Sequence, residues 1–273
     1  MPQFIVLDDT RRHPELAERI TEILRTVAPM VEEATGLPVP PTVRYRLMTP
    51  TAWRHELREQ RRRSLVRDIA DLDLPSEHVK AAHLSLKITS FIPVLVWPLV
   101  LGATGEAADG QSETFIAPRA LRHTGLLAHE PSLNQMVIHE LTHQLQAEAR
   151  SDDAAWHTVL PHLRNVDTKG VSAFVEGHAH WTDQHVTTQM YGHPVDHHRQ
   201  APRSLRYRMH NSFPGVRRLG PSRSSYEQGA LLIRRAVASQ GVDLVNRVWK
   251  DVSLLPTREE IAAPETWIRR IAV

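Results

Sequence analysis

The chain has 273 residues, of which 41% are hydrophobic and 23% are charged. This is the composition of an ordinary globular protein, and it excludes a wholly disordered or fibrous chain. The 33 basic and 31 acidic residues nearly balance, and there is no cysteine, which excludes disulfides and thiolate metal sites. Any metal must therefore be held by nitrogen or oxygen ligands.

The first part of the chain, about residues 1–130, mixes helical and strand patterns. Pro14 opens an amphipathic helix, and we expect Pro29 to disrupt it because proline lacks the amide hydrogen that a helix needs. Further along, the pattern predicts a strand at 42–48, a charged helix at 52–70, a loop at 103–112 and a strand at 113–117.

Two segments bear on location and partners. The N-terminus lacks a signal peptide, and the apolar run 88–103 contains two prolines and falls short of the roughly 20 residues that span a bilayer. We interpret that run as core and expect a cytoplasmic protein without a membrane partner. We interpret the basic stretch 54–67 as the solvated face of an amphipathic helix. The alternative is a surface patch that binds an acidic substrate or a nucleic acid. We expect no nucleic-acid partner, and no particular oligomeric state is predicted.

The second part, about residues 131–273, is predicted to be helical. Helices are expected at 133–149, 171–190 and 224–240, after the capping box of Thr257 and Glu260, and from Pro264 onward. The residue pattern of the tract 191–221 indicates neither a helix nor a strand. Its histidines are interpreted as surface residues, with a second metal site as the alternative: His193, His197, His198 and His210. No linker stands out, so we predict a single domain over 1–273, of α+β class and mostly helical with a small sheet.

The sequence His139-Glu140-Leu141-Thr142-His143 lies within the helix predicted at 133–149. Residues four apart share one face of a helix, so His139 and His143 can bind a single ion. Glu140 is offset by one position and can take a proton from a water on that ion. The motif therefore predicts a zinc site with Glu140 as general base.

A catalytic zinc takes three protein ligands and keeps one position open. No histidine follows the motif closely, so the third ligand must come from another element. Glu176, in the helix predicted at 171–190, is our choice, and His178 and His180 are competitors.

The residues around the metal are less defined by the sequence. Asp183, Asp152 and Asp153 are candidates for orienting a metal-bound imidazole. Amide hydrolysis also needs a donor to the developing oxyanion. We predict Tyr226 in that role, and the alternatives are Tyr207, His180 and His210.

Three blocks of sequence resemble the zincin-like metallopeptidase type 2 family. They are residues 113–118 (ETFIAP) ahead of 137–146 (VIHELTHQLQ), then 174–179 (FVEGHA), then the series 226–229, 246–249, 255–257 and 264–269. The resemblance implies a zincin fold, with His139, His143 and Glu176 as ligands and Glu140 as base. It implies no particular substrate, and this chain has His180 where many gluzincins carry an acidic residue.

The sequence thus predicts a zinc-dependent hydrolase of gluzincin type, a metallopeptidase or amidase acting on a peptide or small amide. The residues at 113–117 are expected to form the edge of the cleft and to pair with an extended substrate. Two alternatives remain. The triad of two histidines and one carboxylate also suits a non-haem iron oxygenase, and a zincin fold can serve as a catalytically silent binding protein.

Overall fold

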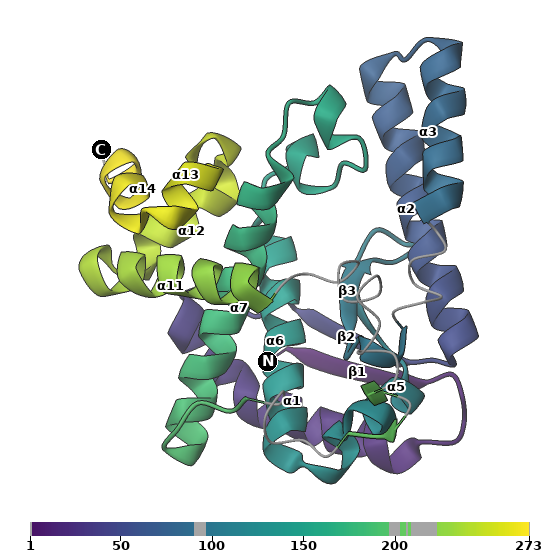
Figure 1. Cartoon of the computed structure of the whole chain (residues 1–273). Coiled ribbons are helices and arrows are strands. Elements are labelled where there is room, and N and C mark those ends of the chain that lie inside the picture. The colour runs from purple at the N-terminus through teal and green to yellow at the C-terminus, as the bar shows by residue number, and fades with distance from the viewer. Residues whose placement is uncertain (1, 90–96, 197–202, 206, 209–222, 273) are drawn as a thin grey trace.

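The computed structural model describes residues 2–89, 97–196, 203–205, 207–208 and 223–272 (Figure 1). Its N-terminal part contains β1 (Gln3–Asp8), α1 (Pro14–Thr35), β2 (Thr42–Leu47), α2 (Pro50–Leu72), α3 (Ser76–Thr89), β3 (Ala103–Glu106), β4 (Ser112–Ile116) and α5 (Pro118–Thr124). Its C-terminal part contains α6 (Glu130–Ala149), α7 (Thr168–Tyr191), α11 (Arg223–Gln240), α12 (Val242–Lys250), α13 (Arg258–Ala262) and α14 (Pro264–Ile271). Short 3-10 turns lie between these elements. The predicted fold class, mostly helical with a small sheet, is confirmed.

The four strands form one mixed sheet in the order β1-β2-β4-β3. β1 and β4 both run parallel to β2, whereas β3 pairs with β4 in the antiparallel sense. β1 and the short β3 were not predicted, and the segment 103–112 is a hairpin rather than a loop. These strands are only a few residues long, and it is pairing with a neighbour that stabilises them.

The first helix continues through Pro29 and ends at Thr35, so the predicted disruption is wrong. Its apolar stripe stays buried on both sides of the proline, which outweighs the missing hydrogen bond. The helix stops at Gly36, which adopts the left-handed conformation at φ 65° and donates its N–H to the Glu32 carbonyl at 2.8 Å.

The helix α6 lies against the sheet, and polar side chains fix its position. The Gln144 amide donates to the Arg44 carbonyl at 2.9 Å and accepts from the Arg44 N–H at 3.2 Å, as a neighbouring strand would. The Tyr45 hydroxyl donates to the Val137 carbonyl at 3.1 Å. The predicted stripe of Leu133, Val137, Leu141 and Leu145 is fully buried. The motif from His139 to His143 therefore lies on a helix whose orientation is fixed by these contacts.

The helices α7 and α11 touch backbone to backbone at two glycines. A Cβ atom on Gly177 would overlap the backbone of Gly229, and one on Gly229 would overlap the backbone of Ala173 and Gly177. Only glycine permits this approach. The crossing matters for the site because Glu176 and Tyr226 lie within one turn of it.

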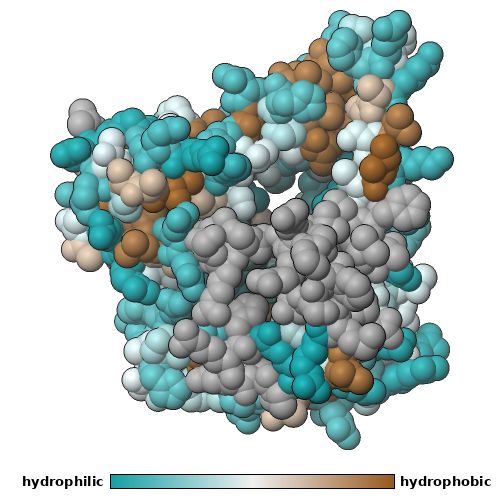
Figure 2. All heavy atoms as spheres, in the orientation of Figure 1, coloured by the Kyte–Doolittle hydropathy of each residue, from teal (hydrophilic) through white to brown (hydrophobic). Residues whose placement is uncertain are grey.

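The C-terminal helices and the α2–α3 hairpin stand on opposite sides of the molecule (Figure 1). The space-filling view shows the surface hollowed between them (Figure 2). Three of the six arginines of α2 form described ion pairs, Arg62 with Glu59, Arg63 with Glu56 and Arg67 with Glu106, which fits the face of a helix. Ile88 is exposed and Trp97 buried, so the run 88–103 is only partly core, and residues 90–96 lie outside the described part.

The largest hydrophobic cluster contains residues from α1, the sheet, α6 and the C-terminal helices. The single domain over 1–273 nevertheless stays a prediction. Within the described residues, no helix is both long enough and apolar enough to cross a membrane.

Candidate metal centre

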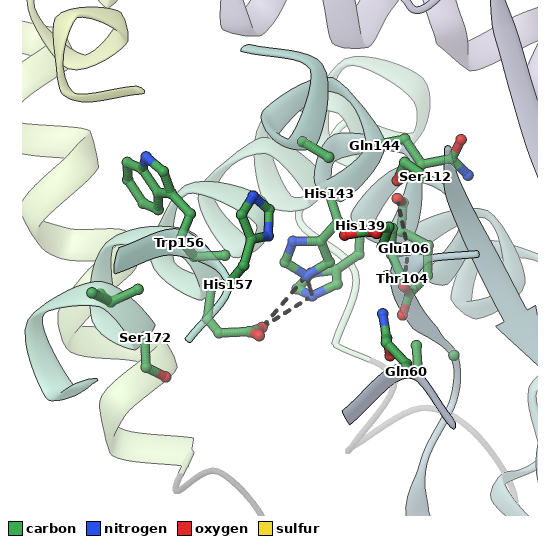
Figure 3. A pocket seen from close by; sticks show the side chains of 18 of the residues that line it. Gln60, Thr104, Glu106, Ser112, His139, His143, Gln144, Trp156, His157 and Ser172 are labelled. Carbon is green, nitrogen blue, oxygen red and sulfur yellow. Dashed lines mark hydrogen bonds and ion pairs between the residues drawn. The ribbon is translucent and has the colours of Figure 1, made fainter. Parts of the chain in front are cut away.

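The two histidines of the motif point their rings toward each other on the cleft side of α6 (Figure 3). Their Nε2 atoms lie 3.2 Å apart. Both side chains are partly exposed, at 19% for His139 and 14% for His143, so an ion can reach them. The spacing of four residues places them on one face, as the sequence predicts.

Glu176 approaches the histidines from α7. Its Oε2 atom lies 3.5 Å from His139 Nε2 and 3.6 Å from His143 Nε2, so the three atoms form a nearly equilateral triangle. Ligands about 2.0–2.1 Å from a tetrahedral zinc ion lie about 3.3–3.4 Å from one another. The three side chains thus fit a tetrahedral ion that keeps a fourth position open, and together they form a group that could hold a metal.

Hydrogen bonds from the opposite ring nitrogens orient both imidazoles. His139 Nδ1 lies 3.0 Å from Asp183 Oδ2, and His143 Nδ1 lies 2.9 Å from Gln146 Oε1. Because these oxygens can only accept, each Nδ1 carries the hydrogen and each Nε2 keeps a lone pair with which it could bind an ion. Of the three aspartates considered, Asp183 thus lies at the site. Asp152 is exposed, and Asp153 caps the Ala155 N–H at 2.8 Å.

The competing histidines face elsewhere. His178 is buried, and its Nδ1 lies 3.1 Å from Gln146 Nε2. His180 has both ring nitrogens engaged, with Nδ1 at 3.3 Å from Asp183 Oδ2 and Nε2 at 2.9 Å from the Gln184 amide nitrogen. Neither side chain is part of the metal-binding group.

The electrostatics of the group favour a cation. Burial alone would lower the pKa of His139, but hydrogen bonds to Asp183 and Glu176 raise it well above its usual value. Burial alone would raise the pKa of Glu176, but the charges and hydrogen bonds of His143 and His139 hold it well below its usual value. The carboxylates of Glu176 and Asp183 therefore stabilise positive charge between the histidines, and a divalent ion would provide that charge.

Glu140 turns from the histidines toward β3. The Thr104 hydroxyl donates to Glu140 Oε2 at 2.7 Å, and a Cβ on Gly102 would lie only 2.7 Å from Glu140 Oε1. The carboxylate is therefore confined between α6 and the strand, beside the three ligands. Thr104 was not predicted from the sequence, because its segment was read as a loop.

Tyr226, on α11, lies over the centre with its ring 6.3 Å from the His139 ring. Burial, the charge of Glu176 and a hydrogen bond to Glu176 together raise the pKa of the hydroxyl well above its usual value, so it stays a donor. The other candidate donors are less well placed. Tyr207 accepts from Arg203 at 2.8 Å, His180 is engaged as described, and His210 lies outside the described residues.

The histidine-rich tract contributes no described metal group. His193 is exposed, and His197 and His198 lie outside the described residues. Gln146 is a residue of the site that sequence reasoning missed. Its position three residues after His143, on the same helical face, was the available signal.

Residues 162–268 match the model of the zincin-like metallopeptidase family, so the predicted resemblance to this family is confirmed over that part of the chain. The matched segment contains Glu176 and Tyr226 and supports a hydrolase.

A solved structure agrees over almost the whole length. It is that of a proposed hydrolase with a novel fold from Chloroflexus aurantiacus, similar to this chain with a TM-score of 0.53 and 16% sequence identity. The similarity covers 96% of this chain and 91% of that chain, and at this identity it shows the fold alone. Comparison with curated protein sequences gives no match.

We predict that His178 makes the metal-free protein sensitive to acid. Burial lowers the pKa of His178 from 6.5 to about 3, whereas the unfolded chain keeps the ordinary value. Between these two values the unfolded state binds the extra proton, so stability falls as the pH drops below 6.5. The free energy of unfolding should decrease by about 2 kcal/mol from this group between pH 6.5 and 5.

Urea unfolding of the metal-free protein at several pH values measures this slope. His178→Asn keeps an acceptor for Gln146 without a titrating group, so its slope should be shallower. Equal slopes in the two proteins would show that His178 is not the acid-sensitive group.

Proposed function

We propose that the protein is a zinc-dependent hydrolase of gluzincin type that cleaves an amide bond in a peptide or a small amide. The observation that carries this proposal is the triangle of His139, His143 and Glu176 with the confined carboxylate of Glu140 beside it. A group that only bound metal would need no second carboxylate held at its side.

Each residue has a distinct role in the proposed reaction. His139, His143 and Glu176 would hold a zinc ion, and the ion would supply Lewis-acid activation of a water and of the amide carbonyl. Glu140 accepts the proton of the attacking water and passes it to the leaving amine. Thr104 holds the Glu140 carboxylate in place.

Tyr226 is the proposed donor to the oxyanion that develops on the carbonyl oxygen. Its hydroxyl keeps its proton and lies at the candidate metal centre, where it donates a hydrogen bond to Glu176. Upon substrate binding it would exchange this partner for the carbonyl oxygen.

The edge at which a substrate would lie is β3, and the expected edge at 113–117 is wrong. That segment forms β4, which is paired with β2 on one side and β3 on the other. β3 ends the sheet and lines the cleft together with Gly102. At the C-terminal end of β3, the Glu106 carbonyl is not available to a substrate, because it accepts a hydrogen bond from Arg63 at 2.8 Å. An extended substrate would therefore pair near Thr104, next to Glu140.

Metal content and turnover test the proposal together. The purified protein should contain about one zinc per chain by mass spectrometry, and it should release amines from a pool of random peptides and simple amides. Removing the metal with a chelator should abolish this hydrolysis, and zinc should restore it.

The alternatives give different results in the same experiment. Iron as the bound metal, with oxygen-dependent oxidation of the substrate, would replace the hydrolase by an oxygenase. A zinc-loaded protein that hydrolyses no member of the pool would leave a binding protein of zincin fold.

A further inference from the structure

Arg150 follows the last residue of α6 and lines the same cleft as the candidate metal centre. Its guanidinium carbon lies 5.1 Å from the centre of the Trp156 ring and 5.8 Å from that of the buried Trp249. Cation–π contacts of this length hold the planar group in one orientation. Trp156 lies on one side of the two ligand histidines, opposite Gln60, Thr104 and Glu106 (Figure 3).

Among the residues that the structure describes, no carboxylate is paired with this guanidinium. Its Nε is sealed from solvent without a hydrogen bond, and none of the described residues forms an ion pair with it. The acidic residues nearest in sequence, Glu148 and Asp152, are exposed. The charge of Glu176 attracts the Arg150 guanidinium, but the Glu176 carboxylate lies beside the histidines and forms no ion pair with Arg150. Burial lowers the pKa of Arg150 to about 10, so it remains charged at neutral pH.

Two other arginines at or beside the cleft are neutralised. Arg67 pairs with Glu106 at 2.7 Å, and Arg164, beside the cleft, pairs with the buried Asp68 at 2.9 Å. Arg61, on α2, makes neither an ion pair nor a cation–π contact with any described residue. Arg150 is therefore an oriented cation of the cleft for which the described residues provide no counter-charge.

A partly buried cation without a partner is unfavourable, and a guanidinium fork matches a carboxylate with two parallel hydrogen bonds. We propose that the substrate carries a carboxylate, either a free C-terminus or an acidic side chain, which binds to Arg150 while the amide lies at the metal centre. This inference rests on the proposed hydrolase function and names its substrate class.

The experiment compares matched pools of N-acetylated random hexapeptides. The first pool ends in a free carboxylate, the second in a carboxamide, and the third ends in a carboxamide but contains one fixed glutamate. Wild-type protein should consume the first or the third pool at least about tenfold faster than the second. The faster pool identifies whether the carboxylate is the terminus or a side chain.

Variants connect this preference to Arg150. Arg150→Met should lose it, Arg150→Lys should keep part of it because the charge remains without the fork, and Arg67→Met should keep it fully. Circular dichroism and zinc content show whether each variant is folded. The comparison of pools on the wild-type protein needs no variant, so a misfolded Arg150→Met leaves the inference testable.

A binding measurement separates this inference from the proposed function. Zinc-loaded Glu140→Gln, immobilised, should retain carboxylate-bearing peptides at least about tenfold better than carboxamides, and Arg150→Met in that background should not. Retention without hydrolysis by the wild type would support Arg150 as an anion site and contradict the hydrolase. Hydrolysis and retention of all three pools at equal levels would overturn the carboxylate inference and leave the hydrolase standing.

Discussion

Replacing Glu140 by glutamine should lower turnover by about a thousandfold while zinc stays bound, since positioned general bases contribute about 10²–10⁴-fold. The amide of glutamine has nearly the shape of the carboxylate and can still accept from Thr104, but it cannot take a proton from the attacking water. The three ligands are unchanged in this variant. Steady-state amine release and zinc content, measured on the same preparation, test both halves of the expectation.

Glu148→Gln is the matched control. It makes the same chemical change on the same helix, at an exposed position. Its turnover should equal that of the wild type. If Glu140→Gln kept wild-type turnover, the assignment of Glu140 as the general base would be wrong, whatever the metal content.

Replacing Glu176 by alanine should weaken zinc binding by more than about a hundredfold, because losing a group that merely orients a ligand already costs 10–100-fold. The variant removes one of the three proposed ligands together with the negative charge that would balance the ion. It also frees the Tyr226 hydroxyl from its partner. Zinc content after dialysis, and competition with a chelator of known affinity, give the size of the loss.

His180→Ala distinguishes the third ligand from its nearest competitor. His180 lies one turn after Glu176, and both its ring nitrogens contact protein side chains. This variant should retain about one zinc per chain. Full zinc in Glu176→Ala, with loss in His180→Ala, would transfer the role of third ligand to the histidine.

The sequence predicted the core of the candidate site because that part depends on local geometry. Four residues make about one helical turn, so the pairing of His139 with His143 follows once the segment is helical. The choice of Glu176 over His180 was harder, since both lie on one helix, one turn apart. The distinction depends on the hydrogen bonds of the His180 imidazole to Asp183 and Gln184, and the periodicity of the sequence does not reveal these bonds.

The parts of the fold that were missed depend on distant contacts. β3 contains glycine and a charged residue and resembles a loop until β4 lies beside it. Thr104 was missed for that reason, although it touches Glu140. Pro29 was expected to disrupt the first helix because the loss of a backbone hydrogen bond is evident from the sequence, whereas the burial that offsets this loss comes from tertiary packing.

The glycine crossing of α7 and α11 has a consequence for how variants of this protein should be interpreted. Gly177 and Gly229 take no part in the chemistry, but neither can gain a methyl group without separating the two helices. Such a separation would carry Glu176 away from Tyr226, so a purely steric change would eliminate activity as thoroughly as the loss of a ligand. A mutational survey would therefore rank both glycines among the least tolerant positions. If catalytic residues were assigned from mutational tolerance alone, Gly177 and Gly229 would be mistaken for residues that take part in the reaction.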